Sequence, residues 1–145
     1  MNTAIFSKRL AAFLIDVVIL YTILQIIIFF TFLFVTPDIF SQLIRAVPLI
    51  LIFQFLYFIL FWAFANGATP GMMLLRIRIA QANGSEISFG QSVIRYVGFI
   101  LSALPLFLGF IWVLFDDQNQ GWHDKIAKTI VISEEERKRN NKRHP

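Results

Sequence analysis

The fold of this chain is decided by residues 8–35, which read KRLAAFLIDVVILYTILQIIIFFTFLFV. From Leu10 to Val35 the run is 26 residues long and almost entirely apolar. It is interrupted by Asp16, Thr22, Gln25 and Thr31. A helix needs about 20 apolar residues to cross the hydrocarbon core of a bilayer. The stretch therefore predicts a membrane-spanning helix that carries a buried carboxylate.

The composition excludes a soluble globular domain. Hydrophobic residues make up 57% of the 145 residues, charged residues only 15%, and 17 residues are Phe. These values predict an integral membrane protein of the all-α class. The absence of cysteine excludes disulfides, thiolate metal sites and Fe–S clusters. The net charge of +4 comes largely from residues 137–143, and because no groove-reading element accompanies them we expect no nucleic-acid partner.

Asp16 is costly at membrane depth, by about 2.5 to 3.5 kcal/mol on insertion scales, so we expect it to face protein or water. Its nearest candidate partner is Arg9. Seven residues separate the two on one helix face, about 10 Å along the axis. That spacing is long for an ion pair unless Arg9 reaches inward, so the candidates for a second partner of Asp16 are Arg95 and a water-filled pocket that reaches Arg9.

A second apolar run, 46–65, predicts a second span, joined to the first by a short loop at residues 36–45. The two spans should form an antiparallel hairpin. The first run is too long for a signal peptide and no cleavage site follows it, which favours an uncleaved span. With Lys8 and Arg9 before the first span, we expect a multi-pass protein of the bacterial inner membrane with a cytoplasmic amino terminus.

Residues 66–71 are dense in turn formers and should end the second span. After them, 76–79 alternate arginine with isoleucine, and with Asn83-Gly84 and 86–88 they predict a short β-hairpin on the cytoplasmic side. Arg76 and Arg78 could contact lipid phosphates, or the hairpin could be a structural clasp. Residues 129–132 also have strand composition and could pair with 76–79, which favours a cytoplasmic carboxy-terminal tail.

The third apolar region, 89–115, contains Arg95 near its start and Pro105 and Gly109 in its middle. Either it crosses once or it breaks near Pro105 into two arms, because proline interrupts a helix. A second arm of ten residues, about 15 Å, spans half a bilayer and would be re-entrant. The number of crossings stays open from the sequence.

These residues resemble the RDD family of small bacterial membrane proteins. The resemblance covers nearly the whole chain, and its motifs are Lys8-Arg9-Leu10-Ala11-Ala12-Phe13 leading to Asp16, Thr69-Pro70-Gly71, Arg78, Arg95, Phe115-Asp116 and Gly121-Trp122-His123-Asp124. The family is named for one arginine and two aspartates. The arginine and the first aspartate match Arg9 and Asp16, while the second matches Asp116, with Asp124 as the rival.

The resemblance implies transport of a ligand, and sodium–proton exchange has been ascribed to a member. Two positions depart from the family pattern. Met72 stands where a lysine commonly follows the Pro-Gly pair, and Arg76 stands where glycine is frequent. A phosphate-binding role for this loop is correspondingly less supported.

Two functions remain open from the sequence. In a transporter or cation–proton exchanger, Asp16 would hold the cation or proton, with Asp116 or Asp124 near the cytoplasmic mouth and Arg95 as a further pathway candidate. A homo-oligomer or larger membrane complex would be needed to enclose a route. In an accessory or scaffold protein, Arg9 and Asp16 would form a structural polar lock, and the partners would be membrane lipids and other chains.

We expect no enzyme activity, cofactor or metal site. His123 and His144 are the two histidines, and neither stands in metal-ligand spacing with the other. His123 beside Asp124 resembles an acid–base pair, but sequence neighbours point in different directions. Capping or anchoring of the tail turn by His123 and Asp124, with Trp122 at the membrane interface, is therefore favoured. The expected organisation is a membrane domain at 1–135, with spans near 10–35, 46–65 and 89–115, and a basic, disordered tail at 136–145.

Overall fold

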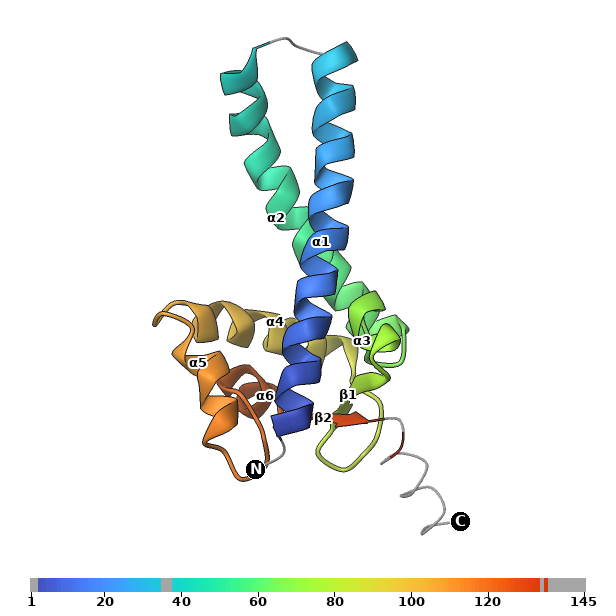
Figure 1. The fold of residues 1–145 in the computed structure, drawn as a ribbon, viewed down its shortest axis with the longest axis vertical. Coiled ribbons are helices and arrows are strands. Elements are labelled where there is room, and N and C mark those ends of the chain that lie inside the picture. The colour runs from blue at the N-terminus through green and yellow to red at the C-terminus, as the bar shows by residue number, and fades with distance from the viewer. Residues whose placement is uncertain (1–2, 35–37, 134, 136–145) are drawn as a thin grey trace.

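The computed structural model describes residues 3–34, 38–133 and 135 (Figure 1). Two long helices, α1 (Thr3–Phe34) and α2 (Ile39–Phe64), form a hairpin. All other elements gather at the end of the hairpin where α1 begins. They are α3 (Pro70–Leu74), β1 (Ile77–Gln81), α4 (Phe89–Ala103), α5 (Leu108–Ile111), the 3-10 turn η1 (Trp112–Leu114), α6 (Trp122–Ala127) and β2 (Thr129–Ser133).

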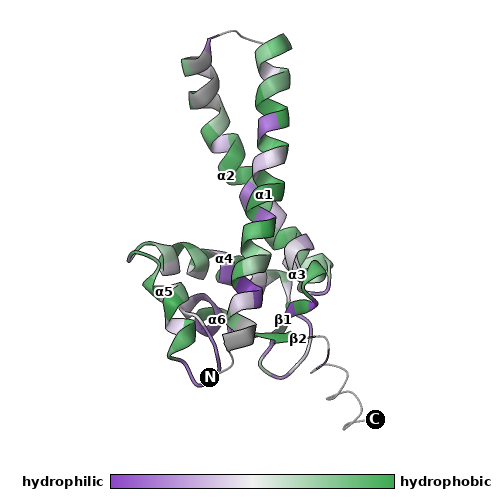
Figure 2. Cartoon of the chain, in the orientation of Figure 1, coloured by the Kyte–Doolittle hydropathy of each residue, from purple (hydrophilic) through white to green (hydrophobic). Residues whose placement is uncertain are grey.

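Within the described residues, two helical segments are long and apolar enough to cross a membrane, Phe6–Phe34 and Ala46–Phe64. Figure 2 shows that the visible face of the outer half of α1 is mostly green, and hence hydrophobic, with a few purple or pale residues between. The expected mostly helical architecture with apolar spans and a small β-element is confirmed. The loop predicted at 36–45 is wrong in its extent, because α2 already begins at Ile39. Asp38 caps it by accepting hydrogen bonds from the N–H groups of Phe40 and Ser41.

The core lies where the hairpin meets the smaller elements. Its fully or largely buried apolar side chains come from α1, α2, the loop after α2, α3, the sheet and the loop after β1. They are Ala12, Tyr57, Phe58, Trp62, Ala68, Met72, Ile77, Ile79, Ile87 and Val131. The outer half of the hairpin has no comparable core in the described residues, as most of its large apolar side chains are exposed. Exposed apolar surface on this scale is what lipid, and not water, accommodates.

The strands β1 and β2 form an antiparallel two-stranded sheet in which Ile79 is opposite Val131. The pairing expected between 76–79 and 129–132 is therefore confirmed. The predicted β-hairpin is wrong in its second strand, because residues 86–88 form no strand. Ser88 instead caps α4, exchanging hydrogen bonds with Gln91 in a capping box. Residues 86–88 have the composition of a strand, but the hydrogen bonds between Ser88 and Gln91 begin a helix there instead.

The third apolar region is a bent pair of helices. α4 and the α5–η1 segment meet at an angle of 109°. The break lies at 104–107, where Pro105 is followed by Leu106 and Phe107, both with positive φ. Figure 1 shows α4 running crosswise to α1 at the foot of the hairpin. In the described residues, the two helices of the hairpin are the candidate membrane crossings. A third candidate exists only if this bent pair of helices counts as one span.

The face that α4 presents to the protein is polar, and its outer face is apolar. Ser92, Arg95, Gly98 and Ser102 are buried. Ile94, Val97, Ile100, Leu101 and Leu104 are exposed. This inside-out pattern is the reverse of that of a helix on a water-soluble domain. The basic tail expected at 136–145 lies outside the described residues.

Candidate functional site

Asp16 lies near the middle of α1 and is only 2% exposed. Its Oδ1 accepts hydrogen bonds from the Tyr57 hydroxyl at 2.8 Å and from the Gly71 N–H at 2.9 Å. Its Oδ2 accepts one from the Thr69 hydroxyl at 2.5 Å. The three donors come from α2, the loop after it and α3. One carboxylate therefore ties three segments to α1.

The turn at 66–71 makes this arrangement possible. Thr69 caps α3 by accepting a hydrogen bond from the Met72 N–H, and Pro70 follows at the first helical position. Gly71 approaches α1 so closely that a Cβ there would overlap the Ala12 carbonyl oxygen. Only a residue without a side chain allows this contact, which brings the Gly71 N–H to Asp16.

A second buried carboxylate, Asp124 at the start of α6, is fully buried at 0% exposure. Arg9 of α1 donates to its Oδ2 at 2.7 Å, and Arg95 of α4 donates to its Oδ1. Arg95 also donates to the Thr129 hydroxyl at 2.6 Å, and the Gly121 N–H donates to Asp124 at 2.9 Å. Asp124 thus joins α1, α4, α6 and the start of β2.

The structure corrects the expected partners. The polar lock between Arg9 and Asp16 is not formed, because Arg9 reaches Asp124 while Asp16 accepts from Tyr57, Thr69 and Gly71. Arg95 likewise pairs with Asp124 and not with Asp16. The physical reason is the spacing on α1, which separates Arg9 from Asp16 by nearly two turns and places them against different neighbouring elements.

Asp116 lies apart from these clusters. It pairs with Lys125 and accepts hydrogen bonds from the N–H groups of Gln118 and Gln120. Burial acts to raise the pKa of Asp116, but Lys125 and the Gln120 N–H outweigh it and lower the pKa. Of the two candidates for the second family aspartate, Asp124 is the one that shares a cluster with Arg9.

His123 is buried beside this cluster. Its Nε2 lies 3.5 Å from Asp124 Oδ2, and its Nδ1 lies 3.4 Å from the Ser102 hydroxyl. Burial lowers the pKa of His123 to about 3, against the opposing effect of Asp124. For Asp124, burial acts to raise the pKa, but Arg95, His123 and Arg9 lower it well below the ordinary range. His123 is therefore neutral and Asp124 ionised at neutral pH.

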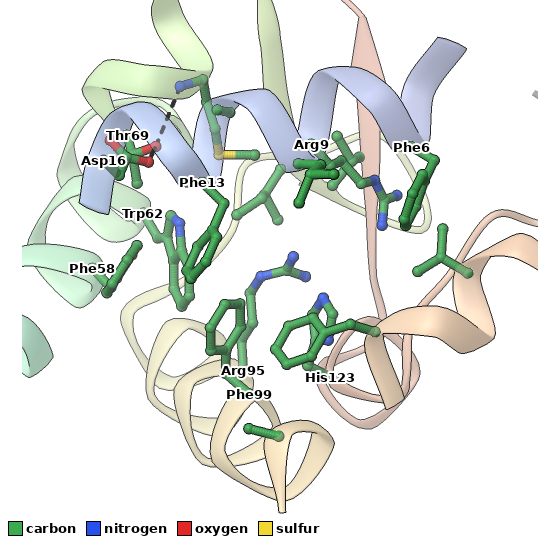
Figure 3. Close-up of a pocket in the computed structure, with 18 of the residues that line it drawn as sticks. Phe6, Arg9, Phe13, Asp16, Phe58, Trp62, Thr69, Arg95, Phe99 and His123 are labelled. Atoms are coloured by element: carbon green, nitrogen blue, oxygen red, sulfur yellow. Dashed lines mark hydrogen bonds between the residues drawn. The ribbon is translucent and has the colours of Figure 1, made fainter. Parts of the chain in front are cut away.

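A half-open cavity of about 350 Å³ lies between α1 and the α4–α5 elbow (Figure 3). Its wall includes Arg9 and Asp16 from α1, Trp62 from α2, Arg95 from α4 and His123 from α6. Figure 3 shows the guanidinium groups of Arg9 and Arg95 directed into the same space from opposite sides. The Arg95 guanidinium carbon also lies 5.3 Å from the centre of the Trp62 ring, a cation–π contact.

The remaining candidates are dispersed. Arg78 on β1 is buried, whereas Arg76, with a positive φ, is exposed. Trp122 packs against Trp112, with ring centres 6.4 Å apart. No group of three or more His, Asp or Glu residues suited to a metal ion occurs among residues 3–34, 38–133 and 135.

Residues 3–128 match the RDD family, and this stretch contains both buried carboxylates, Asp16 and Asp124. The chain belongs to the RDD family. The resemblance noted from the sequence is thereby confirmed. The arrangement of Arg9, Asp16 and Asp124 at the foot of an apolar hairpin is the polar centre of this RDD protein.

This RDD protein is also similar to individual bacterial proteins. It is 32% identical to an uncharacterized protein of Bacillus subtilis (strain 168), over 58% of this chain and 55% of the relative. It is 31% identical to a proline-rich antigen homolog of Mycobacterium tuberculosis (strain ATCC 25618 / H37Rv), over 46% of this chain and 28% of the relative. A third relative, an uncharacterized protein of Rickettsia prowazekii (strain Madrid E), is 35% identical over 52% of this chain and 42% of the relative.

The alignments thus span about half of the Bacillus relative (55%) and less of the mycobacterial one (28%). No solved structure matches the chain significantly.

Sequence reasoning missed Tyr57, Thr69, Gly71 and Thr129 as members of the polar clusters. A signal was present for two of them, since Thr69-Pro70-Gly71 is the sequence of a capped helix start, and such a start offers N–H groups to a carboxylate. For Tyr57 and Thr129 no local signal exists, because their hydroxyls act across long sequence separations.

Proposed function

We propose that this RDD protein is a multi-pass protein of the bacterial cytoplasmic membrane that acts as a non-catalytic accessory or scaffold protein and does not exchange ions. The observation that carries the proposal is the environment of Asp16, whose two oxygens accept hydrogen bonds from Tyr57, Thr69 and Gly71. A cation at Asp16 would have to displace donors that join α2 and α3 to α1. Loading and release of an ion would then loosen the core.

Asp124 supports the same conclusion. It is ionised, fully buried and held by Arg9, Arg95 and the Gly121 N–H. A carboxylate between two guanidinium groups is poorly suited to bind a further cation, because both neighbours repel it. The two carboxylates therefore serve as anchors that position a rigid foot against an apolar hairpin, leaving the hairpin surface for lipids, for a second copy or for another membrane protein.

We place the amino terminus and the sheet in the cytoplasm. The start of α1, β1, β2 and α6 lie at one end of the hairpin (Figure 1). That end carries Lys8, Arg76, Lys125 and Lys128, all exposed. An excess of Lys and Arg next to the membrane favours the cytoplasmic side.

The experiment is ion flux in proteoliposomes loaded with a pH-sensitive dye and challenged with sodium, potassium and proton gradients. The wild-type protein should give no flux above protein-free liposomes. Asp16→Asn should instead lower the free energy of unfolding by about 1.5 to 3 kcal/mol, because charge-assisted hydrogen bonds are lost. Asp117→Asn, an exposed carboxylate converted in the same way, is the matched control and should stay within about 0.5 kcal/mol of wild type.

A second candidate, cation–proton exchange, has one observation in its favour. Asp16 and Arg9 line the same half-open cavity, so the carboxylate has a route to the surface. Flux that requires Asp16, lost in a folded and equally inserted Asp16→Asn protein and kept in Asp117→Asn, would establish exchange and overturn the accessory role.

A further inference from the structure

We infer that the cavity between α1 and the α4–α5 elbow is a binding site for one anionic phospholipid. The phosphate of the lipid lies at Arg9 and Arg95, and one acyl chain leaves through the apolar mouth of the cavity. This inference goes beyond the accessory role, because that role assigns no ligand to the cavity.

The charge at the end of the cavity formed by Arg9 and Arg95 favours an anion. Arg9 and Arg95 share a single carboxylate, Asp124, so this cluster has two positive charges and one negative charge. Asp16 lines the same cavity and contributes a negative charge, but it lies nearly two helical turns from Arg9 and accepts its hydrogen bonds from Tyr57, Thr69 and Gly71. In surroundings from which water is largely excluded, an unbalanced guanidinium attracts a phosphate strongly, and guanidinium geometry matches phosphate oxygens.

Donors without acceptors lie in the same wall. Within the described part of the chain, the Nε atoms of Arg9 and Arg95 and the indole Nε1 of Trp62 are buried and have no hydrogen-bond partner. Arg95 and Trp62 are each only 3% exposed, and all three residues line the cavity. Buried donors are nearly always satisfied in native proteins, so such a cluster points to an acceptor that occupies the cavity when the protein is in its membrane.

The rest of the wall and the mouth are apolar. Phe6, Leu10, Phe13, Phe107, Phe110 and Ile111 all line the cavity. Of these, Leu10, Phe13, Phe107 and Ile111 are also exposed at the surface. A water-soluble anion would leave this apolar surface in contact with water. An acyl chain would cover it.

The volume decides how much of the lipid enters. About 350 Å³ is at the small end of the range for ligand cavities. It accommodates a phosphate and the first part of one chain, and the rest of the molecule stays in the bilayer. The inner end of the cavity, at Arg9, lies near the beginning of α1. With a cytoplasmic amino terminus, as proposed above, this end is at the depth of the anionic head groups of the cytoplasmic leaflet.

The test uses the fluorescence of Trp62, which lines the cavity. The chain has three tryptophans, so Trp112→Phe and Trp122→Phe leave Trp62 as the sole emitter. This protein, delipidated in a neutral detergent, is titrated with phosphatidylglycerol brominated near the head-group end of its chains, and with phosphatidylcholine of the same chains. We expect phosphatidylglycerol to quench Trp62 at about tenfold lower concentration, the effect of one charge-assisted contact.

Arg9→Gln should abolish this preference while keeping the Arg95–Asp124 pair balanced in charge. Lys8→Gln is the matched control, because it removes the same charge from the neighbouring, exposed position and should keep the preference. If Arg9→Gln does not fold, Ala103→Leu provides the second variant. It narrows the cavity without changing a charge and should weaken quenching by both lipids.

Three outcomes would overturn the inference. Equal quenching by the two lipids would show that no anion site exists. Competition by inorganic phosphate without any quenching by lipid would show a site for small anions only. Loss of the preference in Lys8→Gln to the same degree as in Arg9→Gln would assign it to general surface charge. Each can occur whether or not the proteoliposomes show ion flux, so failure here is distinct from failure of the accessory role.

Discussion

At the scale of single residues, Gly71 and Asp16 together show how a turn is fixed against a membrane helix. The N–H of Gly71 reaches Asp16 only because the backbone of the turn touches α1 at Ala12. The hydrogen bond therefore needs both a glycine at position 71 and a carboxylate at position 16. Each would be unfavourable without the other.

Replacing Gly71 by alanine should push α3 away from α1. The added Cβ would overlap the Ala12 carbonyl oxygen and lie 3.0 Å from the Asp16 carboxyl carbon. We expect the free energy of unfolding in detergent micelles to fall by about 1 to 3 kcal/mol, as for other overpacked sites. Gly90→Ala is the matched control, since a Cβ there meets nothing within 4 Å, and it should be neutral or stabilising. Equal effects of the two substitutions would contradict the close approach of α3 to α1.

His123 should make stability depend on pH. Its pKa is about 3 in the folded protein against 6.5 for the ordinary side chain, because burial disfavours the charged ring. The unfolded chain therefore binds a proton that the folded protein does not, and stability falls as pH drops below 6.5. Between pH 7.5 and pH 5 the loss should be about 2 kcal/mol.

The measurement is the free energy of unfolding at both pH values for wild type and for His123→Phe, which keeps a ring against Phe99 and Phe110. The substitution should remove most of the dependence. The low pKa of Asp124 adds nothing in this window, because that carboxyl is ionised in both states above pH 5. An unchanged pH dependence in the variant would show that His123 is not the titrating group.

At the scale of elements, α4 is a helix that faces the protein with its polar side and the surroundings with its apolar side. It is held by Arg95, which bonds to Asp124 of α6 and to Thr129 of β2. The proline break after it turns the chain by 109° and returns it to the foot of the hairpin. The buried ion-pair cluster therefore holds α4 to α6 together with the contacts of Ser102 and Phe99 on His123.

Asp124→Asn should detach these elements, because Arg9 and Arg95 would lose their shared counter-charge in a buried site. We expect a loss of about 3 to 5 kcal/mol in the free energy of unfolding, typical of breaking a buried pair. Asp116→Asn, which affects a carboxylate near the surface paired with Lys125, should cost at most about 1 kcal/mol. Faster hydrogen exchange in α6 of the first variant and not of the second would locate the effect, and the opposite order would show that Asp116 is the structural aspartate.

At the scale of the whole molecule, the protein consists of an apolar hairpin for the membrane and a polar-centred foot of short elements. What the sequence by itself determined was the membrane class, the two long apolar helices, the interrupted third region and the strand composition at 76–79 and 129–132. These features depend on local hydropathy, side-chain period and Pro or Gly signals, which can be read without knowing distant contacts.

Only the tertiary structure decided which groups meet. From the sequence, Asp16 had Arg9 as its nearest partner, yet its donors are Tyr57, Thr69 and Gly71, at separations of 41, 53 and 55 residues. Arg9 in turn bonds to Asp124, 115 residues away. A buried carboxylate requires donors but does not specify where along the chain they come from. Their identity follows from how α3, α4 and α6 pack against α1, which local sequence does not encode.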